Sequence, residues 1–386
     1  PAPPGRRVTA MPRTAPLSGQ ALAGGSPDGR RFFHTLDGLR GAAALAVVIL
    51  HDPGFVLPLV MPSAYLAVDF FFLLSGFVLA HAYGSRLAGG LTLRRFLRDR
   101  LVRFYPLYFL GLMVGAVSGA VALALGGGSM ETLQGLLIAL GTGLAFLPSP
   151  TAHETPGIFP LNSPGWSLFF ELLVNMLFAC LLPYLSLRRL LAITLLAAVA
   201  LVWSVLEYGN LDTGSAWFNV WGGFARVGFS FFAGVLLYRL HRQGFVTSRL
   251  AWMLPLLLMA ILMVEVPPEY RRLFDLAMVM LAFPALLLVS SMLEPGRFLA
   301  PVFLRLGALS FPIYAIHFPV QELLRRCVRF LDIDPVELAP WAGLVVLPAM
   351  IAVSLWLARH YDRPLQRRLR QRRELKLRLA TIRVPG

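Results

Sequence analysis

The chain has 386 residues, of which 57% are hydrophobic and only 14% are charged, and its mean hydropathy is +0.68. This composition excludes an ordinary soluble domain, so we predict an all-α polytopic membrane protein, a bundle of transmembrane helices. The net charge is +15, but the arginines cluster between the apolar segments and at both ends of the chain, which is typical of membrane topology and not of nucleic-acid binding.

The chain begins with residues 1–31, which are rich in Pro, Gly, Ala and Arg and lack the apolar stretch of a signal peptide. We expect a disordered cytoplasmic tail there, a transmembrane domain over 32–362 and a basic cytoplasmic tail over 363–386. Cys180 and Cys327 show no CxxC or metal-ligand spacing, so neither a disulfide nor a metal site is predicted.

Apolar segments long enough to span a bilayer are predicted at 36–57, 64–83, 104–126, 166–186, 190–207, 219–239, 250–266, 272–292, 306–324 and 340–360. A further apolar stretch, 130–148, is interrupted by glycines. The arginine-rich loops 84–103 and 187–189 should both be cytoplasmic, which requires an even number of crossings between them. We therefore expect about ten spans with both termini in the cytoplasm, and 130–148 at the interface or re-entrant.

The first span carries Arg40 and His51, eleven residues apart in an otherwise apolar run. At about 100° per residue the two side chains share one face of a helix, about 16 Å apart along its axis. Such residues are costly in a membrane unless they line a protein interior or a wet cavity, so they indicate a functional site. The alternative for His51 is a packing or hydrogen-bonding role.

Next along the chain, the second span contains Asp69 and Ser75, and Asp69 is expected to pair with an arginine of a neighbouring helix. Arg100 and Arg103 then lie one turn apart, just before Tyr105. Such clusters either set orientation and touch anionic lipid or bind phosphate groups, because guanidinium forks match phosphate oxygens.

The fourth span begins at Trp166 and places Ser167, Glu171 and Asn175 on one face, which must look inward. Glu171 could orient a base, contact a substrate or neutralise an arginine. Further along, Arg226 and Asp275 are predicted to belong to internal ion pairs.

The ninth span stacks Ser310, Tyr314 and His317 on one face, and Pro312 should free backbone groups that could bind something. An equally good interpretation is a kinked helix whose Tyr and His side chains satisfy their neighbours.

These segments together resemble the membrane-bound acyltransferase 3 family of bacterial O-acyltransferases, which act on cell-surface glycans and some antibiotics. LDGLRGAAALAVVILH resembles the family's first-helix signature, and VDFFFLLSGF its second-helix block. RDRLVRFYPLY, WSLFFE and SFPIYAIH resemble its paired arginines before Tyr-Pro, its Trp-Ser-Leu block and its late Ser-x-Pro-x-Tyr-x-x-His block. The resemblance covers about 33–360, with the blocks in the expected order.

The resemblance implies transfer of an acyl group, acetyl above all, from acyl-CoA (acetyl-CoA) to a carbohydrate or cell-envelope glycan at the bacterial inner membrane, without a metal. His51 would be the catalytic base, with Glu171 orienting it or the acceptor. Arg40, Arg100, Arg103 and Tyr105 would bind the donor. Substrate contact or support would fall to Asp69, Ser75, Trp166, Tyr314 and His317.

Two other functions fit the same intramembrane charges. A secondary transporter is expected to contain two similar halves, and the Arg40–His51 segment has no counterpart in the second half. A glycolipid flippase or scaffold would use the arginines as phosphate docks and would not need His51.

Overall fold

The computed structural model describes residues 32–124, 132–153, 157–241, 244, 246–369 and 371. The predicted tail over 1–31, most of the one over 363–386 and the first two residues of 130–148 lie outside this description. The chain divides into two compact units, 1–33 and 34–386, and the described helices and strands all belong to the second.

The helices are α1 (His34–Leu50), α2 (Pro53–Val56), α3 (Ala67–Ala88), α4 (Leu93–Ala124), α5 (Leu133–Leu144), α6 (Gly165–Leu181), α7 (Leu187–Tyr208), α8 (Val220–Leu240), α9 (Met253–Met263), α10 (Pro268–Ala277), α11 (Phe283–Met292), α12 (Ala300–Phe330) and α13 (Trp341–Leu357). The π-helical segment η6 (Met278–Ala282) joins α10 to α11, and the π-helical segment η8 (Ala358–Asp362) extends α13. Short 3-10 turns are η1 (Ala64–Leu66), η2 (Pro150–His153), η3 (Leu182–Tyr184), η4 (Trp217–Asn219), η5 (Arg249–Trp252) and η7 (Pro335–Leu338). Strands β1 (Val246–Ser248) and β2 (Leu293–Pro295) form one small parallel ladder, which the sequence did not indicate.

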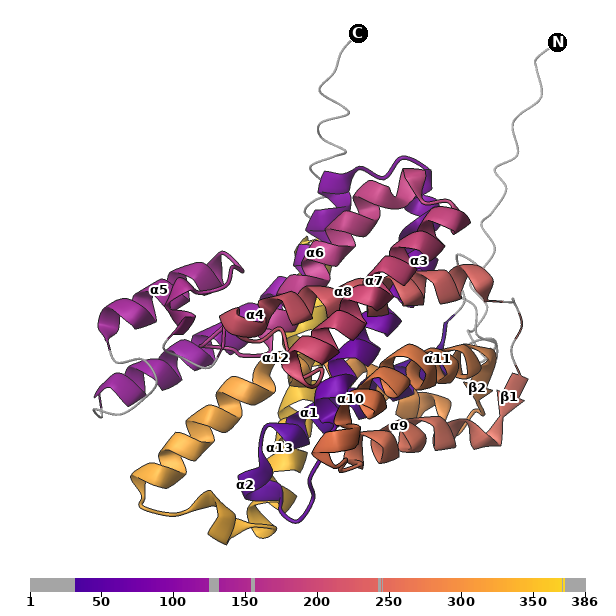
Figure 1. Cartoon of the computed structure of the whole chain (residues 1–386). Coiled ribbons are helices and arrows are strands. Elements are labelled where there is room, and N and C mark those ends of the chain that lie inside the picture. The colour runs from indigo at the N-terminus through magenta and orange to yellow at the C-terminus, as the bar shows by residue number, and fades with distance from the viewer. Residues whose placement is uncertain are drawn as a thin grey trace, which may run out of the picture. The chain divides into compact units, whose positions relative to one another are not determined.

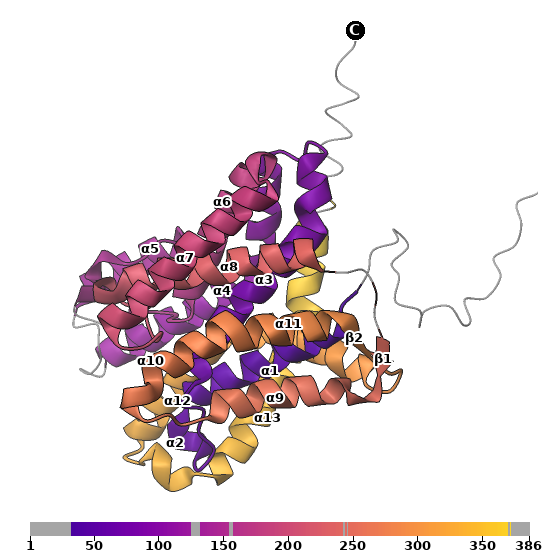
Figure 2. The same cartoon turned by 45° about the vertical axis from the view of Figure 1, so that its right-hand side comes forward.

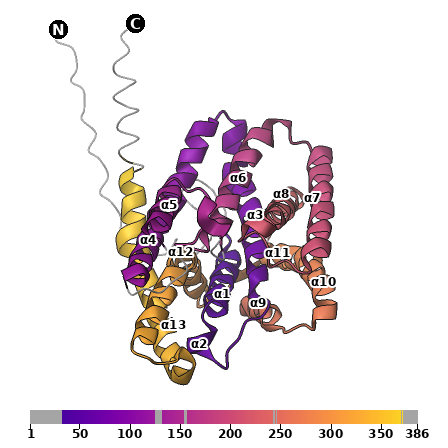
Figure 3. The same cartoon turned by 60° about the vertical axis from the view of Figure 1, so that its left-hand side comes forward.

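The predicted all-α polytopic bundle is confirmed, because eight helices of the described chain are long and apolar enough to cross a membrane. Two of the ten predicted spans are shorter. α1 has 17 residues, and the segment Arg249–Met263 is an apolar helix below spanning length. At 1.5 Å per residue α1 is about 26 Å long, slightly less than a bilayer's hydrocarbon core. It runs through the middle of the bundle, with α3, α9, α11 and α12 around it (Figure 3).

The stretch 130–148 forms the 12-residue helix α5, which extends only about 18 Å. This length agrees with the expectation that the stretch does not cross the membrane. Its location at the interface or in a re-entrant loop stays a prediction.

The packing of α3 against α8 depends on close backbone approach. A Cβ on Gly76 would collide with the carbonyl of Phe231, and a Cβ on Gly234 would collide with the carbonyl of Leu73. Small residues of this kind let membrane helices approach closely, where van der Waals contact replaces the missing hydrophobic force. In contrast, α7 presents a row of exposed apolar side chains to its surroundings, namely Leu195, Leu196, Val199 and Leu206, as a lipid-facing helix does.

The predicted pairing of Asp69 is also confirmed, and its partner is Arg226 on α8, with Nη2 2.7 Å from Oδ2. Both side chains are almost fully buried, and Trp166 covers the guanidinium with its ring centroid 5.3 Å away. Arg226 also donates to the carbonyl oxygens of Thr213 and Tyr65, so the buried cation is well satisfied.

The prediction that Asp275 belongs to an ion pair was wrong. Its carboxylate accepts hydrogen bonds from the Tyr65 hydroxyl, at 2.7 and 2.8 Å, and from the Leu211 backbone N–H at 2.8 Å. Neutral donors therefore hydrogen-bond a buried carboxylate that was predicted to belong to an ion pair.

Candidate active site

The scaffold of the candidate site is the pair α1 and α12, which run parallel in the centre of the bundle (Figure 1). A Cβ on Gly41 would overlap Leu306, so the absence of a side chain there lets the two helices touch. Above this contact, Ala44 and Val48 of α1 pack with Leu309 and Ile313 of α12 in a buried cluster. Figure 2 shows α1 also lying between α9 and α11.

At the N-terminal end of this pair, Arg40 is tied to α12. Its Nε donates to the Ser310 hydroxyl and its Nη2 to the Gly307 carbonyl, both at 2.9 Å. Nη2 also lies 2.8 Å from Asp37 on its own helix. The Arg40 side chain is about one-third exposed, so its guanidinium is fixed by these contacts and still accessible from outside the protein.

His51 follows the last residue of α1, and its ring nitrogens have distinct roles. Nδ1 lies 2.9 Å from the carbonyl oxygen of Val47. A carbonyl can only accept, so Nδ1 carries the proton and, in the neutral ring, Nε2 keeps a free lone pair. No hydrogen bond to Nε2 is found in the described part of the chain, and the side chain is partly exposed. The ring is therefore a base with an available nitrogen.

A second imidazole, His317 of α12, supports this arrangement. Its Nδ1 donates to the carbonyl of Tyr314 at 2.9 Å, so its Nε2 is an acceptor, and this atom lies 3.4 Å from Nδ1 of His51. The Tyr314 hydroxyl in turn lies 2.6 Å from the Ser167 hydroxyl, which itself donates to the Pro164 carbonyl. The Tyr314 ring, whose centroid lies 5.8 Å from that of His317, separates this hydroxyl pair from the two histidines, so α6 reaches His51 through packed side chains.

Glu171 of α6 bonds to side chains of two other helices, α3 and α4. Its Oε1 accepts from the Ser75 hydroxyl of α3 at 2.7 Å and from Nη2 of Arg100 at 3.0 Å. Of the three roles open for Glu171, neutralising an arginine is the one that these contacts fit. Glu171 does not contact His51, for which it was a predicted orienting group; the side chain beside the His51 imidazole is His317.

The predicted loop around Arg100 and Arg103 is helical, because α4 already begins at Leu93. Arg103 lies 4.0 Å from Asp362, and its guanidinium covers the ring of Phe311 at 5.2 Å. The side chain is 36% exposed, and it lies close enough to Arg40, Arg100 and Glu171 for their charges to act on it. Three predicted donor-binding arginines are therefore brought to one end of the bundle.

Comparison with known proteins agrees with this geometry. The family model described as an acyltransferase domain, Acyl_transf_3, matches residues 33–359, from the start of α1 into the last described helix. The chain belongs to the acyltransferase 3 family. It is 30% identical over 359 residues to a protein named acyltransferase MdmB from Streptomyces mycarofaciens, covering 83% of this chain and 87% of that protein.

A second relative of this acyltransferase is "Protein 2 in picA locus" from Rhizobium radiobacter, 41% identical over 191 residues, which is 46% of this chain and 96% of that protein. No solved structure matches the chain. The resemblance noted from the motifs is thus confirmed at the level of the family, and the protein is a membrane acyltransferase.

Not every predicted site residue of the acyltransferase joins the site. Tyr105 donates to the carbonyl of Leu144 at 2.9 Å, and this contact holds the end of α5 against α4. Asp69 and Trp166 belong to the buried Arg226 cluster described above. Glu171 bonds both Ser75 and Arg100. His317 contacts His51, and the Tyr314 ring packs against His317.

The sequence did not single out two further residues around the base. The side-chain amide of Gln321 donates to the Val48 carbonyl at 3.0 Å, and Nη1 of Arg325 donates to the His51 carbonyl at 2.7 Å. Both follow His317 at steps of four on α12, a spacing that would have placed them on its face. That Pro312 frees backbone groups stays a prediction. At Pro319, the other proline within α12, the carbonyl of Ala315, four residues earlier, accepts a hydrogen bond from the Asn162 side-chain amide at 3.0 Å.

Proposed function

We propose that this acyltransferase moves an acyl group, acetyl foremost, from acyl-CoA to a hydroxyl of a carbohydrate or cell-envelope glycan, with His51 as general base. The observation that carries the proposal is the hydrogen bond from Nδ1 of His51 to the Val47 carbonyl, which leaves Nε2 unprotonated in the neutral ring. Imidazole titrates near neutrality, so this nitrogen suits removal of a hydroxyl proton.

The reaction needs one proton to move twice. Nε2 of His51 takes the proton of the acceptor hydroxyl as its oxygen attacks the thioester carbonyl, and the carbon–sulfur bond then breaks. The same proton passes from Nε2 to the leaving sulfur, which gives an ester and a free CoA thiol. In the imidazolium that forms between these two transfers, Nδ1–H remains bonded to the Val47 carbonyl with His317 beside it.

The arginine end of the bundle suits the donor. Arg103 is partly exposed and has only a distant carboxylate partner, and Arg94, Arg95 and Arg98 are exposed on the preceding turns of α4. Guanidinium groups hold phosphate oxygens in paired hydrogen bonds, so the nucleotide phosphates of acyl-CoA fit here. Arg40 and Arg100, fixed by Ser310 and Glu171, would orient the donor closer to the base.

The proposed topology follows from this donor site. Acyl-CoA is cytoplasmic, so the end of α4 that holds Arg100 and Arg103 faces the cytoplasm, in agreement with the positive-inside rule. The protein then lies in the bacterial inner membrane with both termini inside. His51 lies at the far end of α1 from Arg40, which would let an acceptor approach without CoA crossing the membrane.

The test uses purified protein in lipid with acetyl-CoA and a mixed pool of cell-envelope glycans, comparing wild type with His51→Ala at equal folded yield. Acetylated glycan from wild type alone supports both the reaction and the base. Equal activity of the two proteins removes His51 from the mechanism. Binding of CoA lost in His51→Ala but kept when both Arg100 and Arg103 are changed to Ala would reverse the assigned roles.

A further inference from the structure

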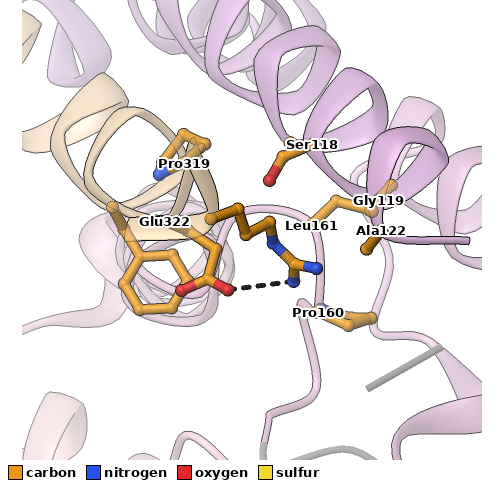
Figure 4. Close-up of a pocket in the computed structure, with 10 residues that line it drawn as sticks. Ser118, Gly119, Ala122, Pro160, Leu161, Pro319 and Glu322 are labelled. Carbon is orange, nitrogen blue, oxygen red and sulfur yellow. Dashed lines mark ion pairs between the residues drawn. The ribbon is translucent and has the colours of Figure 1, made fainter. Parts of the chain in front are cut away.

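A small cavity lies between the C-terminal halves of α4 and α12, at the opposite end of α4 from Arg100 and Arg103. Its walls include Ser118 of α4 and Phe318, Glu322 and Arg326 of α12, and small residues of α4 leave it open (Figure 4). Its volume is about 30 Å³, enough for a water molecule or a hydroxyl-sized group.

The cavity contains polar atoms without a described partner. Ser118 is only 2% exposed, and its hydroxyl makes no hydrogen bond within the described residues. In Figure 4 this hydroxyl points toward the space that the cavity residues enclose. Nε of Arg326 is also buried and unpartnered among the described groups. Since buried polar atoms are nearly always hydrogen-bonded, these two atoms are available to a polar group that enters the cavity.

The charges around the cavity favour a neutral ligand. Glu322 pairs with Arg326 at 2.9 Å and with Arg325 at 3.0 Å, and Arg325 also lies 3.9 Å from the buried Asp52. Two cations thus face two carboxylates, so a charged ligand would gain little. A hydroxyl both donates and accepts, and it can bond Ser118, the carboxylate of Glu322 or the Nε–H of Arg326.

Phe318 contacts both this cavity and His51, the proposed base. Its ring lines the cavity and also packs edge-on against the His51 imidazole, with 5.5 Å between ring centroids. Ser118 follows Arg103 by fifteen residues of α4, about 22 Å along the helix axis. The cavity therefore shares Phe318 with the surroundings of His51 and lies far along α4 from the proposed donor-binding arginines.

We propose that this cavity is the acceptor subsite, and that it binds a hydroxyl of a neutral sugar or polyol next to the hydroxyl that reacts at His51. The inference rests on the proposed function, since it assigns the acceptor side of the same reaction. Ser118 and Glu322 hydrogen-bond the acceptor, and Phe318 packs against its carbon skeleton.

The experiment measures sugar binding without acyl transfer. Saturation-transfer NMR with methyl α-D-glucoside is recorded on protein in lipid nanodiscs, because glycosidic detergents would compete for the subsite. Ser118→Leu fills the cavity and should reduce the transferred signal at least fivefold. Ser118→Ala removes only the hydroxyl and should weaken binding about twofold to tenfold. Val117→Leu is the matched control, because Val117 neighbours Ser118 on α4, is 57% exposed and does not line the cavity.

The outcomes separate this inference from the proposed function. Signal that falls in both Ser118 variants and not in Val117→Leu upholds the subsite. Equal signal in all four proteins, or none in wild type, overturns it. CoA-thiol release from acetyl-CoA is followed on the same samples, and its absence from wild type would count against the proposed reaction while the binding result still decides the subsite.

Discussion

The imidazoles of His51 and His317 meet edge to face, with 5.1 Å between ring centroids and Nε2 of His317 3.4 Å from Nδ1 of His51. In both rings Nδ1 donates a hydrogen bond to a backbone carbonyl, so in each neutral ring the proton is on Nδ1 and Nε2 is unprotonated. Nε2 of His51 takes no part in these contacts and is therefore the nitrogen available to accept a proton.

Replacement of His51 by Ala should reduce acyl transfer by about 10²–10⁴-fold, the usual contribution of a general base. The KM for acyl-CoA should change little, because the arginines that we propose to bind the donor lie elsewhere. Steady-state release of the CoA thiol measures both parameters. The exposed His360→Ala is the control, and a comparable loss of activity there would show that the effect is not specific to His51.

If His317 positions His51, as we propose, its conservative variant should restore part of the function. We expect His317→Phe to lower kcat at least tenfold and His317→Gln, which can still accept a hydrogen bond from Nδ1–H, to retain more. The pH dependence of kcat is recorded for both variants. Equal kcat values and identical pH profiles for Phe and Gln would remove the hydrogen bond from the explanation.

Arg103→Ala should raise the KM for acyl-CoA about tenfold to a hundredfold with little change in kcat, because a charge-assisted phosphate contact contributes about 1.5–3 kcal/mol. Arg188→Ala, on an exposed turn of α7, removes the same charge and serves as the control. A similar rise in KM for both variants would indicate general electrostatic attraction instead of a defined site.

Asp69→Asn should destabilise the fold by about 3–5 kcal/mol, because it leaves the Arg226 cation buried without its counter-charge. Thermal unfolding in lipid or detergent measures the loss, with the exposed Asp212→Asn as the control. The folded fraction should keep the wild-type kcat. A stable Asp69→Asn protein with low kcat would instead place Asp69 in the catalytic site.

Stability should depend on pH through His34, whose backbone N–H and Nδ1 both contact Glu294 at the start of α1. The hydrogen bond to Glu294 raises the pKa of His34 above its ordinary 6.5, against the opposing effect of burial. A raised folded-state pKa stabilises the fold below about pH 6.5, and this contribution is lost as the pH rises through the folded-state pKa.

Glu294→Gln should therefore lower the melting temperature more at pH 6 than at pH 8.5, whereas the exposed Glu269→Gln should lower it equally. Thermal scans of the three proteins at both pH values make the comparison. Equal losses for Glu294→Gln at the two values would contradict the linkage.

The spacing of polar residues on single helices was predictable from the sequence. Ser310, Tyr314 and His317 do share a face of α12, and Ser167 and Glu171 do share an inward face of α6. These patterns follow from the helical period alone, which any amphipathic segment preserves.

The partners across helices were not predictable in the same way. Asp69 was expected to pair with an arginine and does so, but Asp275 found a tyrosine hydroxyl and a backbone N–H instead. Glu171 reached Arg100, and His317 took the place beside His51. Which residues pair across helices depends on how closely the helices pack. Glycine contacts such as Gly41 against Leu306 determine that distance, and the pattern of one segment does not contain it.

The parallel contact between α1 and α12 has a consequence for biosynthesis. His51 directly follows α1, whereas His317 lies 266 residues later in the sequence, and Gln321 and Arg325 lie beyond it on α12. His51, the proposed base, is therefore synthesised well before the α12 residues that contact it. A truncated chain that stops before α12 contains His51 but lacks the residues that contact it, so we expect activity only after α12 has packed against α1.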